Sequence, residues 1–389
     1  MKDVLDSLPA ARRRDEAMRL MARFADRTGL SSSQEAQRYL WTDAFAVCNW
    51  LGLDRVTGDE RHIELALRLV DQVHHVLGQH RPDDRCSGWI SGLAPEDGEA
   101  HPTRGGLRIG KPLPEREAEA PIDERLEWER DGQYFHYLTK WMYALDQLAR
   151  HTGQPLFNEW ARELAQAAHQ AFVYTPRHGG PKRMYWKLSI DLSRPLVASM
   201  GQHDPLDGLL TYTQLEATAA GREPSLSSAI ADFAAMVDPA QIASADPLGI
   251  GGLLVDAHRV LQLKRQGIHV SVPLEDLLIA AELGLRRYCA QPDLRLPAAH
   301  RLAFRELGLA IGLAALERRE WSEASLGVRS VHDRLLPYMP LRNTVEKFWL
   351  EPEHREVAAW TDHLNINEVM LATSLEPSGF LIIPPTRAN

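Results

Sequence analysis

The chain has 389 residues, of which 44% are hydrophobic and 25% are charged, so its apolar content is ample for a core and excludes disorder along the whole chain. The net charge of −9 argues against nucleic-acid binding, which requires a basic excess. No run of about 18 apolar residues is present and the N-terminus has no apolar signal core, so we expect no membrane partner. The widely spaced Cys48, Cys86 and Cys289 form no zinc-type pattern and indicate a reducing, cytoplasmic location.

Segments with helical periodicity follow one another along the sequence. The first covers about residues 2–27, and the second ends near Gly58, where Asp59 can cap the next helix. Pro155 stands where another helix is expected to begin. The segments after the first are 44–56, 60–77, 132–153, 155–174, 204–221, 226–238, 246–267, 273–291, 297–319, 328–340 and 360–376. Strand signals are sparse, with residues 184–190 the best candidate. We predict an all-α fold of about six antiparallel helical hairpins in a single domain over residues 1–389.

The first helix of most pairs opens with an acidic residue beside an aromatic residue or a glycine. Two of these openings match directly, because Asp204 and Asp246 are each followed by Pro-Leu. An aspartate before a proline is also ordinary helix-start chemistry, so the pattern has a structural interpretation as well as a functional one. The openings begin at Trp41, Asp131, Asp204, Asp246 and Trp360.

This rhythm resembles the six-hairpin (α/α)6 toroid of the glycosidase-like superfamily, which includes unsaturated glucuronyl hydrolases, rhamnogalacturonyl hydrolases and relatives of the acylglucosamine 2-epimerases. The resemblance extends over nearly the whole chain as architecture. It implies that every other helix lines the centre and that the loops entering these helices shape the substrate pocket. Residues 201–208 loosely match the acid-rich entry to a central helix, whereas the tryptophan followed by paired aspartates of several hydrolases is absent.

Residues 78–122 form a long segment rich in proline and glycine. Its six prolines argue against a regular helix, and long loops in compact domains tend to be functional. We expect this loop to fold over the mouth of the pocket. Arg104 and Arg108, together with Lys187, would then attract an anionic group of the substrate.

The segment before residue 137 is dense in side chains that suit sugar binding. Aromatic faces stack on pyranose rings, and carboxylates and amides bond to hydroxyl groups, so Trp128, Gln133, Tyr134 and His136 are candidate substrate contacts. Asp131 is a candidate catalytic acid or base, beside a glycine that permits close approach of a ligand. Further substrate contacts are expected at Trp41, Asp43, Trp186, Gln202 and Trp360.

A second catalytic candidate is the segment that contains His203, Asp204 and Asp207. The two aspartates are three residues apart and share one face of a helix. Glycoside hydrolysis needs two carboxyl groups, one of them protonated. We therefore expect Asp131, Asp204 and Asp207 to converge on one cavity, with one of the three pKa values raised by burial or by a like charge.

A histidine pair is the alternative catalytic set. The resemblance to the epimerases implies histidines that move a proton from opposite sides of the ring, and His203 and His363 are the candidates here. Histidine suits this role because its pKa lies near neutrality.

These observations favour a carbohydrate-active enzyme, most simply a hydrolase of a glycosidic or unsaturated uronyl bond in a small saccharide. The alternatives are a sugar epimerase or isomerase and a non-catalytic helical binding or scaffold protein. We expect no cofactor and no metal, since His74, His75 and His80 resemble solvated histidines at a helix end. The oligomeric state stays open.

Overall fold

The computed structural model describes residues 9–291 and 293–386. Helices, with the short 3-10 segments included, account for 62% of the described residues, which confirms the all-α prediction. None of the helices in these two ranges is long and apolar enough to cross a lipid bilayer.

The chain divides into two compact units, each assembled from separate stretches of sequence. We call Met1–Arg27, Asn49–His62 and Asp238–Ile383 the first unit, and Thr28–Cys48, Ile63–Val237 and Pro384–Asn389 the second unit. A single domain over residues 1–389 therefore stays a prediction.

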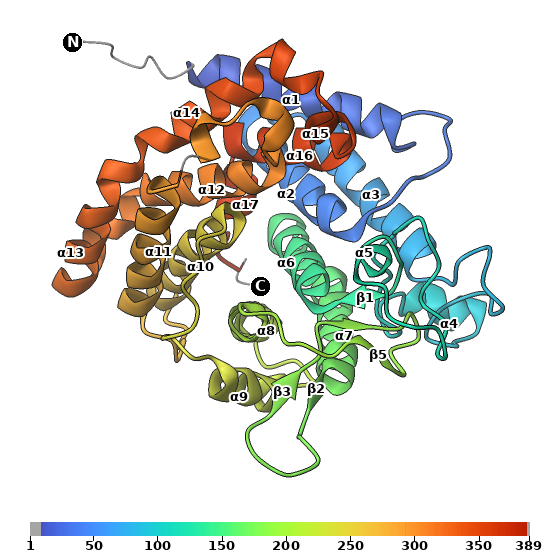
Figure 1. Cartoon of the computed structure of the whole chain (residues 1–389). Coiled ribbons are helices and arrows are strands. Elements are labelled where there is room, and N and C mark those ends of the chain that lie inside the picture. Colours follow the sequence, from blue (N-terminus) through green and yellow to red (C-terminus); the bar gives the residue numbers. More distant parts are fainter. Residues whose placement is uncertain (1–8, 292, 387–389) are drawn as a thin grey trace, which may run out of the picture. The chain divides into compact units, whose positions relative to one another are not determined.

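The first unit combines helices that are buried on every face with helices that bury one stripe. Consecutive buried residues run through α10 (Pro247–Arg265), α12 (Ala303–Leu316) and α16 (Leu364–Leu375), with α12 in contact with both others. Amphipathic α11 (Leu274–Cys289) packs on α10, and α1 (Ala10–Arg27) packs on α16 (Figure 1). The remaining helices are α13 (Leu326–Leu335), α14 (Pro340–Leu350), α15 (Ala358–Thr361) and α17 (Ser378–Leu381), with short 3-10 turns at Asp293–Arg295, Ala298–His300, Arg319–Glu323, Leu336–Tyr338 and Pro352–Arg355.

Two of these helix contacts differ in the groups that make them. Between α10 and α12 the backbones touch, because a Cβ on Gly251 would overlap the Gly308 carbonyl and one on Gly312 would lie 2.5 Å from the Gly251 oxygen. Helix α1 buries an apolar stripe and adds ion pairs beside it. Arg23 and Arg27 donate to Glu368 of α16 at 3.0 and 2.6 Å.

The second unit repeats the helical hairpin. Helix α6 (Phe135–Thr152) packs on α7 (Pro155–Phe172) and on α8 (Asp204–Ala219), and α8 packs on α9 (Ser227–Met236) (Figure 1). Gly153 ends α6 with φ of 76°, and Pro155 occupies the first turn of α7, as predicted. This unit also holds the start of α2 (Leu40–Thr57), most of α3 (Arg61–Leu77), α4 (Pro95–Ala100) and α5 (Glu124–Glu127).

Two small antiparallel sheets connect the helices of the second unit. One has the order β1 (Gln133–Tyr134), β4 (Lys187–Leu188) and β5 (Pro195–Val197), with Gln133 opposite Leu188. The other pairs β2 (Val173–Tyr174) with β3 (Arg183–Met184). The predicted strand at 184–190 is thus split between β3 and β4. The three-stranded sheet holds the segment around Trp186 beside the start of α6.

The long loop 78–122 lies against the ends of helices in the second unit. Its later part reaches the starts of α2 and α6, because Leu40 donates to the Ile109 carbonyl and Ile109 donates to the Gly132 carbonyl. The expectation of no regular helix is wrong at α4. Pro95 occupies the first turn of that helix, where its missing amide hydrogen costs nothing.

Candidate functional site

The starts of α6 and α8 bring aromatic and acidic side chains together in the second unit. The Tyr39 and Tyr137 hydroxyls are 2.6 Å apart, and the ring centroids of Tyr134 and Trp186 are 5.5 Å apart. The Lys140 ammonium lies 2.8 Å from the Asp207 carboxylate. We call the following set the aromatic–acidic cluster: Tyr39, Trp41, Trp128, Tyr134, His136, Tyr137, Lys140, Trp186, Asp204 and Asp207.

Asp204 is the carboxyl group whose chemistry is most altered. It begins α8, its side chain is buried, and its Oδ2 has no hydrogen-bond partner among the described residues. Burial, assisted by the negative charge of Asp207, raises the pKa of Asp204 to about 7, while the Gly201 amide and Lys140 oppose the shift. Asp204 can therefore hold a proton near neutral pH.

Gly201 leaves room for this carboxyl group. A Cβ at position 201 would lie 2.6 Å from the Asp204 Oδ1 and Cγ atoms, so any side chain there would displace the acid. The backbone before α8 thus covers Asp204 closely, which contributes to the burial that raises its pKa.

His136 supplies an imidazole near the Asp207 carboxylate. It lies one helical turn before Lys140 on α6, and its ring stacks on Trp186 with centroids 6.3 Å apart. Burial lowers the pKa of His136 to about 4 against the opposing charge of Asp207, so the ring is neutral at physiological pH. Its Nδ1 has no hydrogen-bond partner in the described part of the chain.

Asp131 has a different environment from the one expected. Its buried carboxylate pairs with Arg108 at 2.6 Å and Arg81 at 3.3 Å, and it accepts amide hydrogen bonds from Gly110 and Gly132. It also does not begin a helix, because α6 starts at Phe135. These partners fix the long loop to the start of α6 and leave Asp131 poorly suited to proton transfer.

Three further residues expected to bind substrate bond to other groups of the protein instead. The Gln133 side chain holds the Leu107 amide and the carbonyls of Gly105 and Ile190. The buried Lys187 ammonium bonds to the Glu127 carboxylate and to two backbone carbonyls. Arg108 is buried against Asp131. Their polar groups meet long-range partners that the sequence does not reveal.

Two other predicted contacts also have internal partners. Arg104 donates to Glu163 of α7 at 3.1 Å and is not part of the aromatic–acidic cluster. Asp43 is buried in the first turn of α2, where it accepts from the Tyr39 amide at 2.9 Å and faces Arg38. Burial raises the pKa of Asp43 to about 6, against the charge of Arg38.

The predicted histidine pair is divided between the two units. His203 precedes α8 in the second unit and is half-buried, with Gln202 exposed beside it. His363 is an exposed residue of the first unit, with its ring edge-on to Phe304. Trp360, expected as a stacking wall, is buried in the first unit against Trp349, because that face of α15 is core.

Three residues of the cluster were not predicted from the sequence: Tyr39, Tyr137 and Lys140. Lys140 could have been found from its spacing, because residues four apart share a helix face and His136 was already a candidate. The Tyr39 contact depends on a pairing 98 residues away and has no local signal. His74, interpreted as solvated, is in fact buried and accepts from the Trp141 indole at 3.2 Å.

Solved structures with similar folds belong to enzymes that act on sugars. One is an inactive variant of the alpha-1,6-mannanase GH76A of Salegentibacter sp. HEL1_6, in which two consecutive aspartates are replaced and alpha-1,6-mannotetrose is bound. It superposes with a TM-score of 0.54 at 11% sequence identity, over 95% of this chain and 99% of that chain. A GH76 alpha-mannanase of Bacteroides thetaiotaomicron gives 0.53 at 8% identity over 95% and 96%. A D-mannose isomerase gives 0.51 at 11% identity over 96% and 99%.

The chain has the (α/α)6 toroid fold. This confirms the architecture implied by the helix rhythm. No family model matches the sequence, and no curated protein matches it. At these identities the similarity is one of fold, so the chemistry must be argued from the residues of this chain.

Proposed function

We propose that the aromatic–acidic cluster is the active site of a glycoside hydrolase, with Asp204 as the general acid and Asp207 as the partner carboxylate. The observation that carries this proposal is the pKa of Asp204, which burial raises to about 7 beside a carboxylate that is paired with Lys140. Two neighbouring carboxyl groups in unlike environments are what acid and base roles in glycoside hydrolysis require.

The choice of carboxylates differs from that in the mannanase. The inactive mannanase variant replaces two consecutive aspartates. In this chain the one Asp-Asp sequence is Asp83-Asp84, which lies in the loop between α3 and α4. Asp204 and Asp207 lie one helical turn apart instead, on the helix that packs beside α6.

A neutral saccharide suits this site better than an anionic one. The cations that would have attracted a carboxylate are engaged within the protein: Arg104 with Glu163, Arg108 with Asp131 and Lys187 with Glu127. Aromatic rings dominate the exposed part of the cluster, where Trp128 is half exposed and edge-on to Trp186. Such rings bind the apolar faces of pyranoses without a need for charge.

An aldose–ketose isomerase or epimerase is the second candidate, and His136 is the observation that favours it. A neutral imidazole near the Asp207 carboxylate can accept a proton from a sugar carbon. In this alternative His136 transfers the proton, a role for which the sequence suggested His203 and His363.

One experiment separates the two chemistries. The purified protein is incubated in D₂O with α-1,6-mannotetraose and, separately, with D-mannose, and the products are analysed by mass spectrometry. The hydrolase predicts shorter oligosaccharides with no carbon-bound deuterium, and Asp204→Asn should abolish them. Conversion of mannose into an isomer that carries deuterium on carbon, and that is lost in His136→Ala, would replace the hydrolase with the isomerase.

A further inference from the structure

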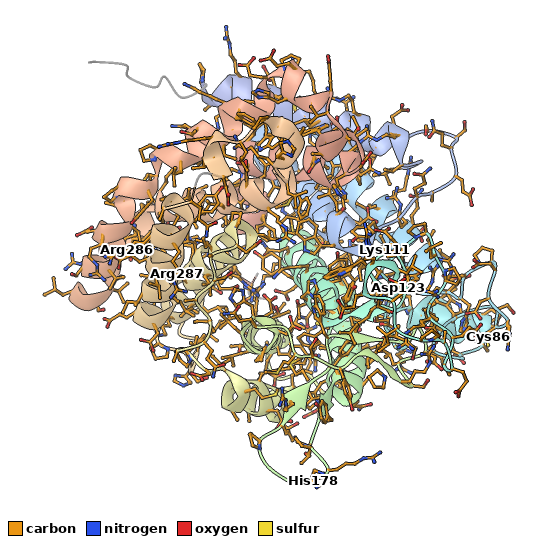
Figure 2. All side chains as sticks on the ribbon, in the orientation of Figure 1. Cys86, Lys111, Asp123, His178, Arg286 and Arg287 are labelled. Atoms are coloured by element: carbon orange, nitrogen blue, oxygen red, sulfur yellow. The ribbon has the colours of Figure 1, made fainter. Side chains whose placement is uncertain are left out.

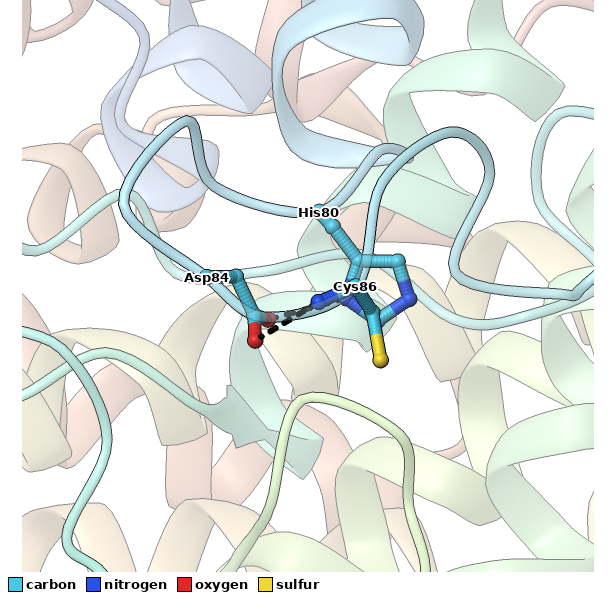
Figure 3. A group of neighbouring side chains, drawn as sticks. All are labelled: His80, Asp84 and Cys86. Atoms are coloured by element: carbon cyan, nitrogen blue, oxygen red, sulfur yellow. Dashed lines mark hydrogen bonds and ion pairs between the residues drawn. The ribbon is translucent and has the colours of Figure 1, made fainter.

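The loop between α3 and α4 gathers three side chains that are typical metal ligands. His80, Asp84 and Cys86 each offer a donor atom, and these atoms all lie within 4.8 Å of one another (Figure 3). No other such group of three His, Cys, Asp or Glu residues occurs in residues 9–291 and 293–386. The loop is outside the aromatic–acidic cluster, and its residues have no part in the proposed hydrolysis.

The geometry already places two of the donors at a separation close to that around a metal ion. His80 Nδ1 and Asp84 Oδ2 are 3.0 Å apart and share a hydrogen bond. Around a tetrahedral zinc ion, with bonds of about 2.0–2.2 Å to nitrogen and oxygen, two such donors would stand about 3.4 Å apart. A metal ion could therefore replace the shared proton after a shift of a few tenths of an ångström.

The backbone holds the loop in shape. Gln79 and Trp89 form an antiparallel bridge, and the amide of His80 donates to the Gly88 carbonyl at 2.9 Å. Within the loop, the Cys86 amide donates to Asp84 Oδ1 at 3.3 Å, which sets the sulfur-bearing residue beside the carboxylate. A preformed arrangement lowers the ordering cost of binding.

The positive charge of Arg81, next to His80 in sequence, is already compensated. Arg81 binds the Asp83 carboxylate through Nε and Nη2, at 2.7 and 3.0 Å, and its Nη1 lies 3.3 Å from Asp131. The same guanidinium donates to the carbonyls of Lys111 and Pro112, which fastens the loop to the body of the second unit. Arg81 therefore holds in place the loop that carries the three donor residues.

We propose that His80, Asp84 and Cys86 form a binding site for a zinc-type divalent transition-metal ion. One nitrogen, one oxygen and one sulfur donor suit Zn²⁺ or Co²⁺ and do not suit Ca²⁺ or Mg²⁺, which take oxygen ligands. Binding releases the thiol proton of Cys86 to solvent, and the metal displaces the proton between His80 and Asp84, which moves to Nε2 of the imidazole or to solvent. Three protein ligands leave one tetrahedral position for water.

The site is reachable from solvent. Cys86 is exposed, the Asp84 side chain is 29% exposed, and the His80 side chain is 13% exposed. Figure 2 labels Cys86 in the peripheral loop that leads to α4, well separated along the chain from the second exposed cysteine, Cys289 of α11. Cys289 is thus a matched control for thiol chemistry.

The test is metal titration of the full chain purified without a polyhistidine tag and stripped with a chelator. We expect one equivalent of Zn²⁺ to bind, and Co²⁺ in its place to show a thiolate-to-cobalt charge-transfer band. Cys86→Ser should abolish the band and weaken Zn²⁺ binding at least about tenfold, and His80→Ala should weaken it similarly. Cys289→Ser and Asp83→Asn should leave the band and the affinity within about twofold of wild type.

Thermal melting supplies a second measurement. Zn²⁺ should raise the melting temperature of the wild type and of Cys289→Ser, and not that of Cys86→Ser. Without metal the two cysteine variants should melt like the wild type, because Cys86 lies in an exposed loop and Cys289 is exposed at the end of α11. Absence of Zn²⁺ binding at micromolar concentration, or a cobalt band that persists in Cys86→Ser, would overturn the proposal.

Discussion

Asp131 and Asp204 are both buried aspartates near helix starts in the second unit, and their surroundings are opposite. Asp131 receives two guanidinium groups and several backbone amides. Asp204 keeps one oxygen without a partner in the described chain and has a pKa of about 7. The difference teaches that burial alone does not identify a catalytic acid, because partner groups decide whether the carboxyl group can hold a proton.

Asp246 extends the comparison to the first unit. It shares the Asp-Pro-Leu sequence with Asp204, yet it caps α10 by accepting from the Leu248 and Gly249 amides at 3.0 and 3.1 Å. The same three residues therefore form a satisfied cap in one place and a buried acid with a raised pKa in the other. The distinguishing feature is the close cover of Asp204 by Gly201, together with the nearby charge of Asp207.

The largest effect is expected for stability at Asp131. Asp131→Asn removes the charge that compensates buried Arg108, and breaking a buried ion pair on one side costs about 3–5 kcal/mol. Urea denaturation should show this loss. Asp83→Asn is the control, since its exposed pair with Arg81 contributes at most about 1 kcal/mol. Equal, small losses in both variants would contradict the anchoring role.

For Asp204→Asn we expect the reverse pattern, with activity lost and stability kept. Removal of the general acid should lower kcat about 100-fold or more, since that is the usual contribution of proton transfer. The melting temperature should stay the same or rise at neutral pH, because the variant no longer buries an acid. Steady-state kinetics and melting curves test both parts. A stable variant with wild-type kcat would remove Asp204 from the mechanism.

The pH dependence of the free energy of unfolding should also reveal the raised pKa of Asp204. The carboxyl group of Asp204 ionises near pH 4 in the unfolded chain and near pH 7 in the folded one. Between these values only the unfolded state loses the proton, so this group makes the folded state less stable as the pH rises from about 4 to about 7. In urea denaturation, Asp204→Asn should gain stability relative to wild type across this window, and a constant difference would contradict the raised pKa.

The smallest effect is expected at the matched helix start of the first unit. Asp246→Ala removes the cap of α10 and should lower stability by about 1 kcal/mol, with no change in kcat or KM. The measurement is the same pair of assays used for Asp204→Asn. A loss of activity comparable with that of Asp204→Asn would mean that both Asp-Pro-Leu segments serve the reaction.

Local features of the fold were predictable from sequence. Gly58 has φ of 67° and Asp59 accepts from the Arg61 amide, as the turn between two helices requires. Pro155 and Gly153 mark helix ends for equally local reasons. Helix periodicity and these turn residues were therefore sufficient for the all-α architecture.

The residues of the candidate site could be predicted only where a local signal exists. Asp204 and Asp207 were predicted as site residues because their spacing places them on one helix face. Lys187 was predicted to contact substrate, because no local sequence signal indicates its ion pair with Glu127, which lies 60 residues earlier. The ion pairs of Asp131 were missed for the same reason, since Arg81 lies 50 residues before it. Long-range charge pairs are invisible to periodicity and spacing.

The two kinds of helix contact in the first unit should respond differently to ionic strength. Around Gly251 and Gly312 the α10–α12 contact is made by backbone, so this part of it contains no charge to screen, whereas the Arg305–Asp246 ion pair lies at the starts of the two helices. The α1–α16 contact depends on arginines that remain partly exposed beside Glu368, and dissolved salt weakens such pairs. Concentrated salt would therefore loosen the N-terminal helix first and leave the glycine contact intact.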